Sequence, residues 1–168
     1  STNSSRAFDG PATSPEKEKE LLAILRSGAA PADKAIVCKN LAIYGSAAAV
    51  PDLAKLLPNP QLSSWARIAL EAIPGEASND ALRNAAASLE GRLLVGMINS
   101  IGVRQDAKSV DILITKLQDA DAEVASAAAV ALGNIGNAAA TKSLRAALAS
   151  VSDSVRSAVA EGCVLCAE

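Results

Sequence analysis

The two cysteines of Cys163-Val-Leu-Cys166 are the residues whose type and spacing most directly suggest chemistry. A CxxC pair serves thiol–disulfide exchange, zinc binding and haem attachment. Haem attachment requires a histidine at the next position, which is Ala167, and zinc requires two further ligands, for which only Cys38 offers another thiol. We predict that Cys163 and Cys166 act as small buried hydrophobic residues, with redox or metal chemistry as the alternative.

A second candidate is the acidic series Asp119, Asp121 and Glu123. Calcium loops contain alternating acidic residues, but they also need a central glycine and a later bidentate glutamate, which this segment lacks. Asp121 as a helix N-cap, with Glu123 in the first turn, explains the same residues. The sequence therefore predicts no catalytic residue, no metal ligand and no cofactor-binding residue.

Composition removes several further classes of function. The chain has no histidine, so the commonest general base and metal ligand is missing, together with every Ser-His or Cys-His nucleophile. The 16 basic and 18 acidic residues are spread along the chain and give a net charge of −2, which indicates no nucleic-acid-binding surface. No segment is apolar enough to span a bilayer. We expect a non-enzymatic protein that binds no nucleic acid and does not insert into a membrane.

Any polar site in this chain must be positioned by closely packed helices. Of the 168 residues, 37 are alanine, whereas Phe, Trp, Tyr and Met contribute four in total. A core made of such small side chains is filled only when backbones approach closely, and alanine has the highest helix propensity. The composition favours an all-α fold over a β-sandwich or barrel.

The expected helices repeat with a period of about thirty residues. Leu53, Leu82, Leu113 and Leu144 are equivalent, at spacings of 29, 31 and 31 residues. A second family of helices, expected over 34–45, 63–75, 91–102, 124–136 and 155–167, alternates with the helices that carry these leucines. We predict an irregular lead-in over 1–13 and one domain over 14–168, with a first helix at 14–27, repeats at about 31–58, 61–89, 90–118 and 121–150, and a final helix at 153–167.

The segment VASAAAVALGNIG, from Val124 to Gly136, is followed by a short turn and a second amphipathic helix. It resembles bacterial HEAT repeats of the short kind, which also occur in phycobilisome-lyase-like proteins. The resemblance runs from about Pro31 to Glu168, with a shorter period than larger HEAT units and with Ala125 where an arginine often stands. It implies a right-handed α-α superhelix, a HEAT-like solenoid of about four to five helix pairs.

The segments CKNLAIYGSAAAVPDLAKLL and CVLCAE resemble, more narrowly, HEAT segments of large exported bacterial proteins. Such segments sit beside c-type haem domains or sugar-active domains, so this resemblance implies an exported or periplasmic setting and a supporting role. In HEAT arrays the second helix of each pair lines the concave face, which commonly takes the partner. Carried over to this sequence, the expected partner-binding residues are Asp52, Lys55, Arg83, Asn84, Asp111, Thr115, Lys142 and Arg145, which we call the polar ladder.

The polar ladder predicts a protein or peptide partner, or a neighbouring domain of the same chain, because no deep pocket with convergent polar groups is indicated. The alternatives are a spacer or docking segment of a larger exported enzyme or cytochrome, and a lyase-like chaperone for pigment attachment. Away from the ladder, we expect Asp106 to cap a helix and Arg104 to bond acidic caps or carbonyls in adjacent turns, with ligand contact as the alternative. Trp65 is expected to be partly exposed or packed on a neighbouring repeat, and Gly96 to permit close helix contact.

Overall fold

The computed structural model describes residues 14–168, and all the regular structure in this range is helical. The expected lead-in over 1–13 lies outside the described residues. The helices are α1 (Pro15–Leu25), α2 (Pro31–Tyr44), the 3-10 turn η1 (Ala47–Ala49), α3 (Val50–Ala54), α4 (Ser63–Ala72), α5 (Glu76–Ser88), α6 (Gly91–Val103), the 3-10 turn η2 (Ala107–Ser109), α7 (Val110–Lys116), α8 (Ala122–Ile135), α9 (Ala138–Ala147) and α10 (Asp153–Ala167).

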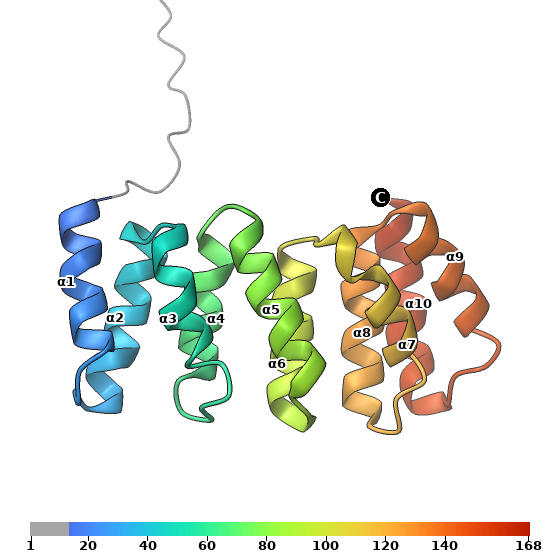
Figure 1. The fold of residues 1–168 in the computed structure, drawn as a ribbon. Helices are drawn as coiled ribbons and strands as arrows, with labels where there is room; N and C mark the ends of the chain where they lie inside the picture. The colour runs from blue at the N-terminus through green and yellow to red at the C-terminus, as the bar shows by residue number, and fades with distance from the viewer. Residues whose placement is uncertain (1–13) are drawn as a thin grey trace, which may run out of the picture.

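The helices stand side by side along the array, from α1 at one end to α9 and α10 at the other (Figure 1). The even-numbered helices α2, α4, α6, α8 and α10 each pack on the next, and we call them the first-helix layer. The odd-numbered helices α3, α5, α7 and α9 each pack against one or two neighbouring helices of that layer. Together with α1 they form the second-helix layer. This arrangement is a HEAT-like solenoid and confirms the all-α prediction.

The helix ends follow from local residue chemistry. Asp121 caps α8 by accepting a hydrogen bond from the amide of Glu123, as predicted, and Gly136 ends the same helix in the left-handed conformation at φ 64°. Pro15 occupies the first turn of α1, but the Ser14 side chain makes no capping bond. The helix expected over 91–102 ends one residue later, at Val103, and Gly102 lies buried within it against α8.

The core runs along the whole array as one apolar cluster. Leu53, Leu82, Leu113 and Leu144, equivalent in the sequence repeat, are all at most 1% exposed, so the repeat marks one core position in each helix pair. Alanines of α8 also belong to this core, since Ala128 and Ala131 are buried and Ala127 packs partly buried against the cluster. One stripe of each helix therefore fills the space between the two layers.

Small residues let the backbones of the first-helix layer meet. A Cβ added at Gly133 of α8 would lie 2.7 Å from the Cα of Gly162 in α10, and one added at Gly102 of α6 would lie 3.0 Å from the Cα of Ala131. These distances are shorter than ordinary van der Waals contact, so a larger residue at either position would have to push the helices apart. The alanine-rich composition therefore specifies the spacing between successive repeats.

Candidate interaction surfaces

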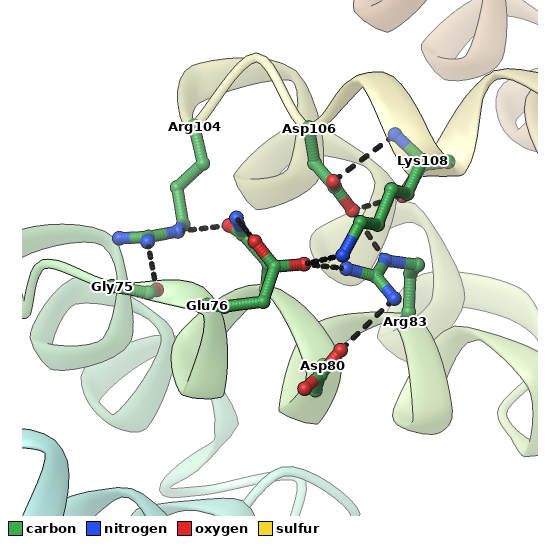
Figure 2. A network of polar contacts seen from close by, with 9 residues as sticks. Gly75, Glu76, Asp80, Arg83, Arg104, Asp106 and Lys108 are labelled. Carbon is green, nitrogen blue, oxygen red and sulfur yellow. Dashed lines mark hydrogen bonds and ion pairs between the residues drawn. The ribbon is translucent and has the colours of Figure 1, made fainter.

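Arg104, the C-cap of α6, reaches back onto the end of α4. Its guanidinium donates hydrogen bonds to the carbonyls of Leu70 at 3.0 Å, Glu71 at 3.1 Å, Ile73 at 2.8 Å and Gly75 at 2.8 Å. Figure 2 shows this side chain lying over the turn that precedes α5. Carbonyls at a helix end have no intrahelical donor, so Arg104 satisfies groups that would otherwise face water or stay unpaired.

The network of Arg104 confirms that its structural role is bonding to carbonyls in an adjacent turn. Its Nε also donates to the Asn79 side chain on α5. Desolvation by burial lowers the pKa of the Arg104 guanidinium, against the opposing attraction of Asp106, Glu76 and Glu71. Even so, an arginine stays charged at any physiological pH. Arg104 is therefore a fixed cationic clamp between two repeats.

Arg83 of α5 pairs with Asp106, whose carboxylate caps the N-terminus of η2. The Arg83 Nε donates to Asp106 Oδ2 at 2.6 Å, while Asp106 also accepts bonds from the hydroxyl of Ser109 at 2.6 Å and the amide of Lys108 at 3.2 Å. The cap predicted at Asp106 is thus confirmed. Glu76 and Asp80 extend the network on its solvent side, as Figure 2 shows.

Charge and burial act in opposite directions on Asp106. Desolvation is the largest single influence and raises the pKa of its carboxyl, but the hydrogen bonds from Arg83 and Ser109, with the Coulomb attraction of Arg83, together outweigh it. The pKa of Asp106 is therefore held below its ordinary value. In turn, the hydrogen bond to Asp106 raises the pKa of Arg83.

A comparable pair lies near the other end of the array. Arg26, just after α1, donates to both carboxylate oxygens of Asp52 in α3, at 3.2 Å and 2.8 Å. This bond from Arg26 lowers the pKa of Asp52. Beside it, Glu18 of α1 accepts bonds from the amide and hydroxyl of Ser46, which caps η1. Side chains of one repeat thus hold the first turns of the next at two places along the second-helix layer.

The residues of the polar ladder differ in how exposed their side chains are. Asp52 is buried under Arg26 and Arg83 is half-buried in the Asp106 network, so both are used within the fold. Two contacts join ladder residues to one another: the Lys55 ammonium lies 3.9 Å from the Asp52 carboxylate, and the Thr115 hydroxyl donates to the Asp111 carbonyl. The six ladder residues with exposed side chains are Lys55, Asn84, Asp111, Thr115, Lys142 and Arg145.

An apolar surface lies on the first-helix layer instead. Ile36 and Ile43 of α2 are 58% and 48% exposed, and Trp65 and Ile68 of α4 are 39% and 45% exposed. Ile36 and Trp65 face a groove of about 480 Å³ between α2 and α4, whose lining is almost wholly apolar apart from Lys39. We call Ile36, Ile43, Trp65 and Ile68 the apolar strip.

Sequence reasoning found only part of the apolar strip. It left open whether Trp65 is partly exposed or packed on a neighbouring repeat, and in the structure Trp65 is partly exposed beside α2. It predicted a helix over 34–45 without saying where its isoleucines lie, because Val37, Cys38 and Leu41 of the same helix are apolar as well and hide the amphipathic pattern. The sequence did show that this helix is apolar on more than one side. Only one side can face the core, so the other apolar side indicates an exposed surface.

The cysteines fit a packing role more closely than a chemical one. Cys38 is fully buried, and burial raises the pKa of its thiol to about 11. Cys163 and Cys166 are half-buried against the core rather than fully buried, and all three thiols are free. Within residues 14–168 no group of three acidic, cysteine or histidine side chains is placed to hold a metal ion. In the same residues no helix has the length and hydropathy needed to cross a membrane.

The comparisons with known proteins agree with this geometry. A family model described as HEAT repeats matches residues 92–163, which cover α7, α8 and α9 and most of α6 and α10. No curated protein matches the chain. The crystal structure of an engineered protein is similar in fold, with a TM-score of 0.55 and 22% identity over 92% of this chain and 80% of the other. The matched segment and the solenoid fold together support a HEAT-repeat protein.

Proposed function

We propose that the protein is a non-catalytic interaction module that binds a partner segment on the apolar strip. HEAT repeats typically mediate protein interactions, and their solenoids are typically non-catalytic. The observation that carries the choice of surface is the exposure of Ile36, Ile43, Trp65 and Ile68 on two neighbouring helices. Apolar side chains gathered in this way are unusual on a solvated surface and are the common centre of protein interfaces.

The charges around the apolar strip specify the chemistry of the partner. Lys39 lies in the groove itself, and Asp33 lies with Ile36 in the neighbouring groove between α1 and α2. Arg67 and Arg92 line the cleft on the other side of α4. Across an interface such cations favour acidic groups. The partner segment is therefore amphipathic, with apolar side chains for the groove of α2 and α4 and at least one acidic side chain beside them.

A peptide selection followed by substitution tests this surface. Peptides are selected from a random library on the wild-type protein, and their Kd is then measured for the variant carrying Ile36→Ser and Trp65→Ser. Both positions are exposed, so the variant retains its fold. We expect apolar peptides with an acidic residue and a loss of affinity of at least about a hundredfold, since two interface anchors are removed.

Val164→Ser is the matched control, because Val164 is an equally exposed apolar residue at the far end of the array, on α10. It should leave the Kd unchanged. Peptides that bind the double variant as tightly as the wild type would refute the proposal. A second copy of the chain as the true occupant would appear as concentration-dependent dimerisation that the double variant abolishes.

The polar ladder is the second candidate surface, and the exposure of Lys142 and Arg145 on α9 favours it. On this proposal an acidic partner binds the concave face formed by second helices. Changing Lys142 and Arg145 to glutamate tests it without disturbing Arg83, which the fold requires for Asp106. Selected peptides that lose affinity for this variant, but keep it for the variant with both strip residues replaced, would transfer the proposed function to the ladder.

A further inference from the structure

A small cleft lies between the first halves of α4 and α6, on the opposite side of α4 from the groove that holds Trp65. Its volume is about 180 Å³, and its polar lining comes from Ser63, Ser64 and Arg67 of α4 and from Arg92 of α6. The two arginines make its chemistry cationic.

Ser63 supplies the observation that points to a ligand. Ser63 borders the cleft, the residue is only 4% exposed, and its Oγ, which is itself buried, has no hydrogen-bond partner among the described residues. It is the one buried side-chain oxygen or nitrogen in residues 14–168 left in this state. Buried hydroxyls are almost always bonded, so an unpartnered one beside a cleft indicates a group that the cleft receives.

Arg67 is held in position by its neighbours. Its guanidinium donates to the Ser100 hydroxyl at 3.1 Å and lies 4.0 Å from the carboxylate of Glu71, which accepts from the same hydroxyl at 2.7 Å. The guanidinium lies against Gly96, where an added Cβ would be only 2.7 Å from the Arg67 Nε. Gly96 thus makes room for the side chain of Arg67, whereas the sequence led us to expect a close contact between helices there.

Arg92 contributes an uncommitted charge. It is exposed on the first turn of α6, and within residues 14–168 it has no acidic side chain within 4 Å. The nearest acidic residue in sequence, Glu90, lines a different groove with Lys116, on the other side of α6. The N-terminal turns of α4 and α6 both border the cleft, so their dipoles add positive potential to that of the two arginines.

We propose that this cleft is an oxyanion subsite that binds the acidic side chain of the partner segment. Arg92 and Arg67 supply the charge, and the Ser63 hydroxyl donates the hydrogen bond that completes the site. The assignment rests on the proposed function for its source of anion, because the cleft and the apolar strip flank the same helix. A carboxylate and a phosphate group share the required chemistry.

Inorganic phosphate tests the site without any partner. Titration into ¹⁵N-labelled protein, at constant ionic strength with chloride as the exchanged ion, should shift the amide resonances of Ser64, Trp65 and Gly96 in a saturable way. Arg92→Gln should weaken the phosphate Kd by about tenfold, because a charge-assisted bond is lost. Arg145→Gln, which removes an exposed cation on α9, is the control and should leave the Kd unchanged.

Ser63→Ala separates ligand binding from folding. Because the Ser63 Oγ has no partner within the fold, its removal should not lower the midpoint of urea unfolding, yet it should weaken phosphate binding several-fold. Shifts spread over the whole surface, or a phosphate Kd that both Arg92→Gln and Ser63→Ala leave unchanged, would overturn the proposal.

A selected peptide then decides the source of the anion. Replacing its acidic residue with the neutral amide should weaken binding to the wild type but not to the Arg92→Gln variant, whereas phosphoserine at that position should bind the wild type more tightly. If the strip variant leaves peptide binding intact, the proposed function fails, and the phosphate titration still decides the subsite. Loss of peptide binding in the strip variant with no phosphate shifts would refute the subsite alone.

Discussion

At the scale of single residues, the polar side chains of this protein are committed mainly to joining repeats. Arg104 satisfies carbonyls at the end of α4, and Asp106 pairs with Arg83 while it begins η2. Sequence reasoning predicted the capping role of Asp106 from its position before a helix. It placed Arg83 on a binding surface, because a repeat pattern shows which residues point away from the core but not which of them meet a charge from the next repeat.

Arg104→Ala should lower the free energy of unfolding by about 3 kcal/mol, since several charge-assisted hydrogen bonds to carbonyls are lost at once. Urea denaturation followed by circular dichroism measures the change. Arg104→Lys should recover only part of the loss, because an ammonium group cannot span the same set of carbonyls. Arg145→Ala is the matched control and should change stability by less than about 0.5 kcal/mol; an equal effect of both alanine variants would contradict the clamp.

The pKa of Asp106 gives the protein a predictable response to acid. Because that pKa is lower in the folded than in the unfolded chain, the unfolded state binds the proton first as the pH falls. The stabilisation is complete above about pH 4, the ordinary aspartate pKa, and is lost as the pH falls through the folded-state value.

Asp106→Asn should therefore cost about 2 kcal/mol at pH 7 and progressively less below about pH 4, where the wild-type carboxyl is protonated as well. Urea unfolding of both proteins between pH 7 and pH 2 tests this. A difference in unfolding free energy that stays constant over the whole range would show that the charge of Asp106 does not contribute.

At the scale of helices, the sequence predicted the elements well and their contacts less well. The leucine repeat located the buried side of α3, α5, α7 and α9, because a single large residue recurs there. The role of a glycine could not be predicted from the sequence, because the same residue type ends a helix at Gly136 and forms a close backbone contact at Gly102. Which of the two occurs depends on the neighbouring helix, and that helix is about thirty residues away in the chain.

Gly133→Ala separates helix propensity from packing. Propensity alone would stabilise α8 by about 1 kcal/mol, but the new Cβ would lie 2.7 Å from the Cα of Gly162 and force α8 and α10 apart. We expect a net loss of about 2 kcal/mol in urea unfolding. Gly28→Ala, where an added Cβ meets nothing within 4 Å, should be neutral; a stabilised Gly133→Ala protein would contradict the close contact of the two helices.

At the scale of the whole molecule, stability is built from contacts between neighbours. A HEAT-like array has no contacts between distant repeats, so each helix is as stable as its own repeat and the interfaces beside it. This organisation also explains why composition and periodicity predicted repeated helices, and why the resemblance to HEAT repeats implied the solenoid, whereas only Trp65 of the apolar strip was noted in the sequence. An exposed surface is not needed for stacking, and the repeat pattern therefore places no constraint on it.

Native-state hydrogen exchange should reveal this organisation directly. Amides of α8, which packs against α6, α7, α9 and α10, should exchange most slowly, and those of α1 should exchange faster, because α1 packs mainly on α2. In Arg104→Ala, which loses the bonds between α6 and the end of α4, exchange should rise in α4 and α5 while α9 and α10 keep their wild-type rates. Equal acceleration in every helix would instead show that the array unfolds as one cooperative unit, in which the Arg104 bonds stabilise all repeats alike.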